Sequence, residues 1–481
     1  MHSGAIASSA MSDDLFFAGV ATQAQLIRDG VVSARELTDA YLDRIIEHDR
    51  SLNAFTVVLH QQARVEADAR DAARNRGDVL PPLHGIPLAI KEEIDVAGQV
   101  TTFGGRANST PVAQDGEVVR RLRDAGAVII GKTAMPEFGQ WPFTESAAHG
   151  LTRNPWDLAK SPGGSSGATA AAVAAGLVPA GLGGDGGGSI RVPAACCGLF
   201  GLKPQRGRVS CAPQPHLWWA LGTVGPLTRT VLDSALIYDA IRGATSGDRF
   251  RADDPESSFV DAVAAGLTGR HRLRIGWSTK AVTRGVRPDP EHVQAVHTIA
   301  TVLADLGHHV EQVDPHYPDP TAAFVPQFFG GVRTGAENVE DAHRLERRTR
   351  QTARLGAWVR PGVLEWAMRQ GEKVAAKANA VFDTHDLLLT PTIAHRPPDV
   401  GVLDGVGPVR ASLRSMPMIA YSALWNVTGN PAASVPAGFG QDNLPLAVQL
   451  VGRPHDETTI LSVAAQLERA RPWADVRPTP A

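Results

Sequence analysis

The stretch SPGGSSGATAAAVAAGLVPAGLGGDGGGSIRVPAACCGLFGLKP, residues 161–204, decides the fold. It contains ten glycines before Ser189 and almost no charge, so its backbone can approach a ligand closely. Gly186, Gly187, Gly188 and Ser189 can point successive N–H groups into one concavity, the arrangement that stabilises a developing oxyanion. A glycine-rich turn that ends in serine is by itself more often structural than catalytic, so its partners decide its role.

Two candidate partners lie elsewhere in the sequence. Ser165 and Ser166 follow two glycines and precede an alanine-rich helix. They either present a hydroxyl near the positive end of that helix or only cap it. Lys91 follows the apolar strand IPLAI at 86–90, where a buried ammonium is costly without a partner. The alternative is a solvated strand end, the usual place for a lysine.

The rest of the chain alternates between helical and strand patterns. Ser33 and Glu36 form a capping box for a helix that runs to about Asp49, and VVRRLRDAGAVIIGKT reads as helix, turn and a buried strand at 127–131. Further on come the strand RLRIGWS, an amphipathic helix at 290–306 and the strand HHVEQV. This alternation predicts an α/β protein with a mixed or mostly parallel sheet between helices.

Two polar or Pro- and Gly-rich stretches, 245–270 and 396–410, are predicted to be surface excursions. Neither has the low complexity of a linker, and no internal repeat occurs. The sequence therefore predicts one large domain, although a length of 481 residues would permit two or three.

Composition excludes several classes of function. The net charge of −3 offers no field for nucleic acid or an anionic membrane. Three cysteines give neither a disulfide framework nor a zinc-binding spacing, and the histidines at 292, 297, 308 and 309 lack metal-pair spacing and are expected at the surface. The N-terminus lacks a signal-peptide pattern, and the apolar run at 168–182 is shorter than the ~20 residues of a membrane span. We expect a soluble cytoplasmic protein without a metal.

Four motifs in this order resemble the amidase signature family: GIPLAIKEEIDVAG at 85–98, GGSSGA at 163–168, GGDGGGSIRVPAACCGLFGLKP at 183–204 and GPLTRTVLD at 225–233. LLLTPT at 387–392 and the stretch at 425–452 resemble the family's C-terminal pattern. The resemblance implies the α/β amidase signature fold, a large mostly parallel or mixed central sheet covered by helices on both faces. It also implies an N-terminal extension at 1–20 and a single domain at 21–475, with its catalytic core at about 80–235.

The same resemblance implies roles for individual residues. The family's catalytic lysine falls on Lys91, its bridging serine with a cis peptide on Ser165, and its nucleophile on Ser189. The remaining positions are the oxyanion donors Gly186, Gly187 and Gly188, and the loop supports Asp185, Arg191 and Ser166. The implied reaction is hydrolysis of a linear carboxylic acid amide to a carboxylate and ammonia or an amine through an acyl-enzyme, without a metal or an organic cofactor. The expected partner is a small-molecule amide, and a homodimer remains open.

Two departures from the family pattern matter for this reaction. Gly184 and Gly186 stand where the family commonly has threonine or another residue with a β-carbon, which predicts a more flexible loop. Glu92 and Glu93 follow Lys91, where the family often has aspartate. A carboxylate near a lysine favours its charged form, which opposes its use as a base. Glu93 would share the face of Lys91 if the strand continues.

Several rival interpretations use the same residues. Gly163 to Gly167 fits the nucleophile elbow G-x-S-x-G, but no buried strand precedes it. Gly181, Gly183 and Gly186 fit a dinucleotide fingerprint, but the ribose-binding acid is missing. A non-catalytic scaffold is disfavoured because all three triad positions keep the required residue types.

The closest rival keeps the fold: the glutaminase (A) subunit of a tRNA-dependent amidotransferase shares the triad. Its glutamine site usually adds an acidic residue before the C-terminal Asn-x-x-Gly motif. The corresponding stretch here, MIAYSALWNVTGNP, has no acid. The sequence therefore favours a stand-alone amidase.

Overall fold

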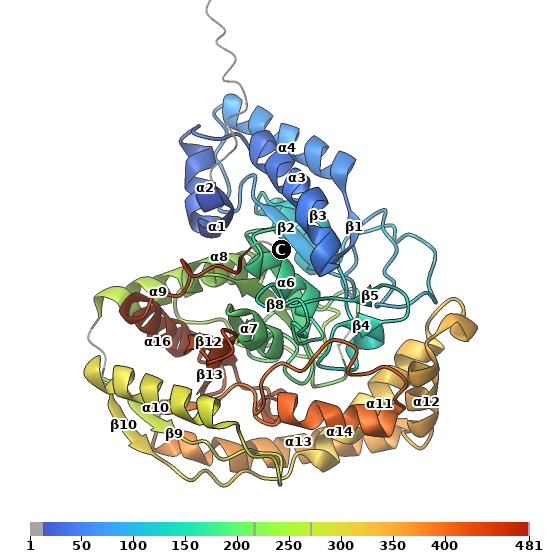
Figure 1. Ribbon diagram of the computed structural model, residues 1–481, viewed down its shortest axis with the longest axis vertical. Helices are drawn as coiled ribbons and strands as arrows, with labels where there is room; N and C mark the ends of the chain where they lie inside the picture. Colours follow the sequence, from blue (N-terminus) through green and yellow to red (C-terminus); the bar gives the residue numbers. More distant parts are fainter. Residues whose placement is uncertain (1–12, 215–217, 270–271, 480–481) are drawn as a thin grey trace, which may run out of the picture.

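The computed structural model describes residues 13–214, 218–269 and 272–479. An 11-stranded sheet has the order β1-β3-β2-β6-β8-β7-β12-β13-β11-β9-β10. Its strands are β1 (Phe55–Val58), β2 (Pro87–Lys91), β3 (Val128–Thr133), β6 (Ala180–Asp185), β7 (Phe200–Lys203), β8 (Thr223–Thr228), β9 (Arg274–Trp277), β10 (His309–Gln312), β11 (Leu387–Pro391), β12 (Ala432–Phe439) and β13 (Pro445–Gly452). In Figure 1, strands β1, β2 and β3 of this sheet lie beside the N-terminal helices, and β9 and β10 lie toward the opposite end of the molecule. A small separate sheet pairs β4 (Glu145–Ser146) with β5 (Gly150–Leu151).

Parallel pairs occur in two groups within the large sheet. β2 lies parallel between β3 and β6, and β9 lies parallel between β10 and β11. The strands from β6 through β8, β7, β12 and β13 to β11 pair antiparallel, and so does β1 with β3. The predicted α/β class with a large mixed sheet is confirmed.

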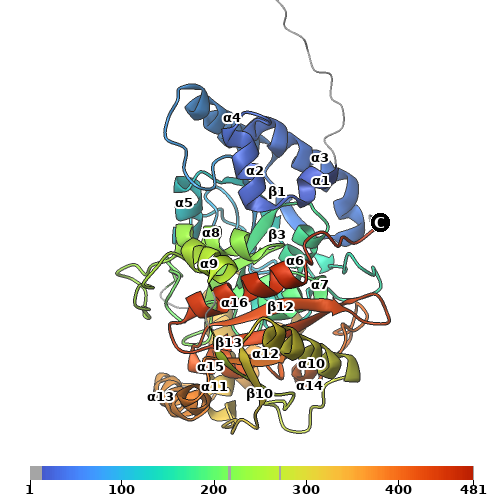
Figure 2. The same ribbon diagram turned by 90° about the vertical axis from the view of Figure 1, so that its left-hand side faces the viewer.

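Sixteen α-helices surround this sheet in the described ranges: α1 (Asp13–Phe17), α2 (Gly19–Arg28), α3 (Ala34–Leu52), α4 (His60–Asn75), α5 (Glu117–Asp124), α6 (Gly167–Ala174), α7 (Arg191–Cys197), α8 (Val231–Ile241), α9 (Phe259–Thr268), α10 (Pro290–Asp305), α11 (Thr321–Glu337), α12 (Arg347–Leu355), α13 (Pro361–Ala378), α14 (Pro408–Ile419), α15 (Ala423–Thr428) and α16 (Glu457–Ala470). α6 and α7 contact each other, and α7 packs on β7, β12 and β13. α8, α9 and α16 form a second group, in which α16 lies against β12 and β13 (Figure 2).

The local patterns in the sequence form the predicted elements. The Ser33–Glu36 capping box begins α3, because each side chain accepts the other residue's backbone N–H. The apolar run before Lys91 forms the fully buried β2, which includes Lys91 itself. The helix predicted at 290–306 is α10, with Pro290 in its first turn.

Three expectations need correction. The stretch at 245–270 contains α9, because Ser258 caps it and its apolar residues, among them Phe259 and Val263, are buried against the core. Within the predicted N-terminal extension, residues 13–17 form α1 and α2 begins at Gly19, and Phe16, Phe17 and Val20 belong to the core. Residues 1–12 lie outside the described residues. The histidines at 292 and 308 are buried rather than at the surface.

Three further features bear on the function classes considered from the sequence. Cys196 and Cys197 are buried free thiols, and burial raises the pKa of the Cys196 thiol to about 12. Within the described ranges, every helix is too short or too polar to cross a membrane. The same residues include no cluster of three or more histidine, cysteine or acidic side chains arranged to hold a metal ion.

Candidate active site

The parallel strands β2 and β6 bring the candidate residues together. Lys91 is the last residue of β2 and Asp185 the last of β6, and these strands are direct neighbours. The carboxyl ends of parallel strands meet at one edge of a sheet, where ligands of α/β proteins usually bind. The turn after β6 carries Ser189 and leads into α7, while Ser165 lies just before α6.

The side chains of Lys91 and Ser165 are in direct contact. Lys91 Nζ donates a hydrogen bond to Ser165 Oγ at 2.8 Å, and the lysine side chain is only 1% exposed. The Gly164–Ser165 peptide bond is cis, as the resemblance implies. The solvated strand end considered for Lys91 is therefore wrong, because the chain around it shields the amine from water.

Ser166 connects the two serine-bearing segments. It stands at the N-cap of α6, yet its side chain makes no capping hydrogen bond. Its Oγ instead donates to Gly184 O at 3.1 Å and accepts from Gly184 N at 3.2 Å. The Ser166 N–H also donates to Ser189 O at 3.3 Å. Ser166 thus holds the segment before α6 against the glycine-rich turn.

A buried ion pair braces the turn that carries Ser189. Arg191 donates to both carboxylate oxygens of Asp185, at 2.9 and 3.0 Å, and both side chains are fully buried. Burial opposes ionisation of Asp185, but the Arg191 guanidinium and the hydrogen bonds from Arg191 and Asn426 outweigh it. They hold the pKa of the carboxyl well below its ordinary value. Asp185 and Arg191, the two residues predicted to support this loop, thus form a bidentate ion pair next to the turn.

Replacing Arg191 by alanine should lower the free energy of unfolding by about 3–5 kcal/mol, because the Asp185 charge is then buried without its partner. Urea denaturation of the purified variant measures this loss. Lys280→Ala is the matched control, since it removes an exposed ion pair with Asp314 and should cost no more than about 1 kcal/mol. Equal losses in the two variants would contradict the bracing role.

The backbone N–H groups of the turn do not all face the same way. Gly188 N–H, one of the predicted oxyanion donors, donates to Asp185 Oδ1 at 2.7 Å in this structure. Within the described ranges, the N–H groups of Gly186, Gly187 and Ser189 meet no protein acceptor. These three groups remain as candidate donors to a bound ligand.

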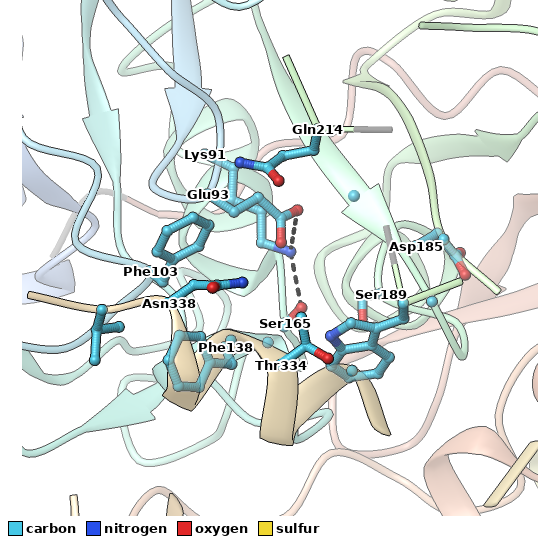
Figure 3. Close-up of a pocket in the computed structure, with 18 residues that line it drawn as sticks. Lys91, Glu93, Phe103, Phe138, Ser165, Asp185, Ser189, Gln214, Thr334 and Asn338 are labelled. Carbon is cyan, nitrogen blue, oxygen red and sulfur yellow. Dashed lines mark hydrogen bonds and ion pairs between the residues drawn. The ribbon is translucent and has the colours of Figure 1, made fainter. Parts of the chain in front are cut away.

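Lys91, Ser165 and Ser189 all line one pocket of about 210 Å³ (Figure 3). Asp185 and Gly186 also line this pocket, and α11 contributes Thr334. The structure therefore brings the three predicted catalytic positions to a common cavity. Residues that the sequence did not single out complete it: Phe103, Phe138, Gln214, Thr334 and Asn338.

The aromatic lining of this pocket has an unusual backbone. Phe103, Phe138 and Trp218 have φ values of 51°, 55° and 45°. Such left-handed conformations are costly for bulky residues, by about 1–3 kcal/mol each, and they cluster at functional sites. No sequence pattern identifies them, because the conformation depends on the tertiary contacts that hold each segment.

The side chains of the two glutamates after Lys91 lie in different surroundings. Glu93 Oε1 lies 3.0 Å from Lys91 Nζ, so the two side chains share a face as predicted (Figure 3). Glu92 is buried elsewhere and accepts hydrogen bonds from the Thr56 and Thr102 hydroxyls, at 2.6 and 2.9 Å. Of the two glutamates, Glu93 is the one that lines the pocket.

The fold and the pocket define an α/β protein with a buried lysine and two serines facing one cavity. Comparisons with known proteins agree with this class: the family model described as Amidase matches residues 36–461. The chain is 47% identical over 469 residues to "Putative amidase AmiB2" of Mycobacterium tuberculosis (strain ATCC 25618 / H37Rv), covering 97% of this chain and 99% of that relative. The chain therefore belongs to the amidase signature family.

Two further matches show the range of this family. The solved structure of 6-aminohexanoate cyclic dimer hydrolase complexed with substrate has a TM-score of 0.90 and 29% identity, covering 96% of this chain and 99% of that one. The chain is also 37% identical over 478 residues to one subunit of the glutamyl-tRNA(Gln) amidotransferase of Synechococcus sp. (strain CC9605), covering 93% of this chain and 95% of that relative.

Proposed function

We propose that this chain hydrolyses the C–N bond of a linear carboxylic acid amide, with Ser189 as nucleophile, Ser165 as proton relay and Lys91 as base. One observation supports the proposal most strongly: Lys91 Nζ lies 2.8 Å from Ser165 Oγ in a pocket that Ser189 also lines. A neutral amine at this distance can accept a proton from the hydroxyl. The products are a carboxylate and ammonia or an amine.

The proposed reaction begins with attack by Ser189, and protons pass from Ser189 through Ser165 to Lys91. Ser189 Oγ attacks the amide carbonyl carbon, its proton passes to Ser165 Oγ, and the Ser165 proton passes to Lys91 Nζ. The carbonyl π electrons move to the oxygen and form a tetrahedral oxyanion. The proton then returns through Ser165 to the leaving nitrogen as the C–N bond breaks. Water, deprotonated by the same relay, hydrolyses the acyl-enzyme.

The free N–H groups of Gly186, Gly187 and Ser189 are the donors available for this oxyanion in the described turn. Donors that are already aligned stabilise such a charge without reorganisation during the reaction. The Asp185–Arg191 pair and Ser166 hold their segment in place. The relay uses only side chains of this chain, so the mechanism calls on no metal or organic cofactor.

The purified chain alone should hydrolyse members of a panel of aliphatic, aryl and peptide amides, because the lysine, both serines and the oxyanion donors lie in one chain. The assay contains EDTA and no tRNA, and the release of ammonia or amine is measured. The rate should be unchanged by the chelator.

The opposite result would favour the glutaminase role within an amidotransferase. Cleavage of glutamine alone, and only after partner proteins are added, would contradict the stand-alone activity. A rate lost on chelation and restored by zinc would contradict the relay.

A further inference from the structure

Glu93 is a charged side chain in the pocket for which the Ser189–Ser165–Lys91 relay has no role. Its side chain is 15% exposed and its Oε1 lies 3.0 Å from Lys91 Nζ. Lys91 Nζ therefore lies between two oxygens, that of Ser165 on one side and that of Glu93 on the other (Figure 3). A base that must receive a proton is thus already in contact with an anion.

Gly184 provides the space that this carboxylate occupies. A Cβ atom at Gly184 would overlap Glu93 Oε1, and the three heavy atoms nearest to it all belong to the Glu93 carboxylate. Gly184 is an ordinary β6 residue without positive φ, so its backbone would accept alanine. The nearest obstacle to a Cβ at this position is therefore the Glu93 carboxylate.

Charged side chains on the segments that surround the pocket already have partners. Asp185 pairs with Arg191, Glu92 with Lys132, and Arg333 with Glu337 on α11. Asp95 accepts from the Thr101 hydroxyl, and Glu137 accepts from the Glu346 N–H. Glu93 is consequently the carboxylate in contact with Lys91 when the charge on Lys91 changes.

We propose that Glu93, in the space left by Gly184, is a positioning residue that holds Lys91 Nζ toward Ser165 and stabilises the ammonium formed during acylation. When Lys91 is neutral, the Lys91–Glu93 pair has a net charge of −1. When the proton arrives from Ser165, the pair becomes neutral while the oxyanion forms at the substrate. The aspartate of a Ser-His-Asp triad stabilises an imidazolium in the same manner. This role rests on the proposed relay.

A carboxylate in contact with an amine stabilises the charged form of that amine by Coulomb attraction. In the proposed reaction, Glu93 would stabilise in this way the ammonium that Lys91 becomes during acylation. Removing it should move the acidic limb of kcat/KM to lower pH and also lower the plateau.

The test compares the pH profiles of Glu93→Gln, Glu93→Ala and Gly184→Ala, each checked for folding by its melting temperature. Glu93→Gln should move the acidic limb to lower pH and lower the plateau roughly ten-fold. Gly184→Ala should move the limb in the same direction, because its Cβ displaces the carboxylate. Gly186→Ala is the matched control: its Cβ meets Trp218 at 2.9 Å, so it should cost rate without moving the limb.

A double-mutant cycle separates a direct contact from general damage. In the Glu93→Ala background the space is empty, so Gly184→Ala should leave the limb where Glu93→Ala alone puts it. An unmoved limb in Glu93→Gln would overturn the proposal, as would a Gly184→Ala shift that persists in the Glu93→Ala background. If Lys91→Ala stays active, the relay itself fails. If Lys91→Ala is inactive and the limb does not move in Glu93→Gln, only this role of Glu93 fails.

Discussion

Replacing Ser189 by alanine should lower kcat/KM for amide hydrolysis by about 10⁴-fold or more, while the protein stays folded. The Ser189 hydroxyl supplies the attacking oxygen in the proposed reaction, and alanine has no group that can take its place. The fold does not depend on that hydroxyl, because the Asp185–Arg191 pair braces the turn and Ser166 N–H bonds the Ser189 carbonyl oxygen. Steady-state kinetics with circular dichroism and a melting curve measure both parts.

The matched control for this variant is Ser234→Ala. Ser234 is buried on α8, it is not among the residues that line the pocket, and its hydroxyl meets no hydrogen-bond partner in the described ranges. Its removal should leave activity and stability nearly unchanged. A Ser189→Ala enzyme that retains substantial turnover with a native spectrum would refute the nucleophile assignment.

Replacing Lys91 by alanine should lower kcat/KM by about 10³-fold or more at every pH, because no base then accepts the Ser165 proton. The residues of a relay act as a unit, so the Lys91→Ala/Ser189→Ala double variant should be hardly slower than Ser189→Ala alone. Kinetics of the two single variants and the double variant, measured over the same pH range, test both expectations.

Lys91→Arg distinguishes a base from a fixed positive charge. Arginine keeps the cation beside Glu93 but is not deprotonated in proteins. We expect this variant to be as inactive as Lys91→Ala. Near-normal activity in either variant would remove Lys91 from the relay and leave its contact with Ser165 as a structural one.

Local patterns in the sequence were sufficient to predict the fold class, whereas the roles expected for Lys91, Ser165 and Ser189 came from the resemblance to the amidase signature family. An apolar strand that ends in lysine places Lys91 at the carboxyl end of β2. Short parallel strands then bring it to the turn after β6. The face shared by Lys91 and Glu93 followed from the alternation of side chains along a strand.

Other features depend on contacts between distant segments and could not be predicted. Asp185 accepts a hydrogen bond from the N–H of Gly188, one of the expected oxyanion donors, and this contact depends on the geometry of the turn. Phe103 and Phe138 enter the pocket from segments with left-handed backbone. A Cβ at Gly184 would overlap Glu93. Both residues depart from the family pattern, and they lie far apart in the sequence.

The most direct test of the central claim is covalent labelling of the intact enzyme with a fluorophosphonate, which reacts with activated serine nucleophiles. Peptide mass spectrometry after digestion locates the adduct. The relay predicts one adduct, on Ser189, that forms in step with the loss of amidase activity, is absent in Ser189→Ala and is strongly slowed in Lys91→Ala. Inactivation accompanied by an adduct on a different residue, or full labelling of Ser189 in Lys91→Ala at the unaltered rate, would contradict the proposed chemistry.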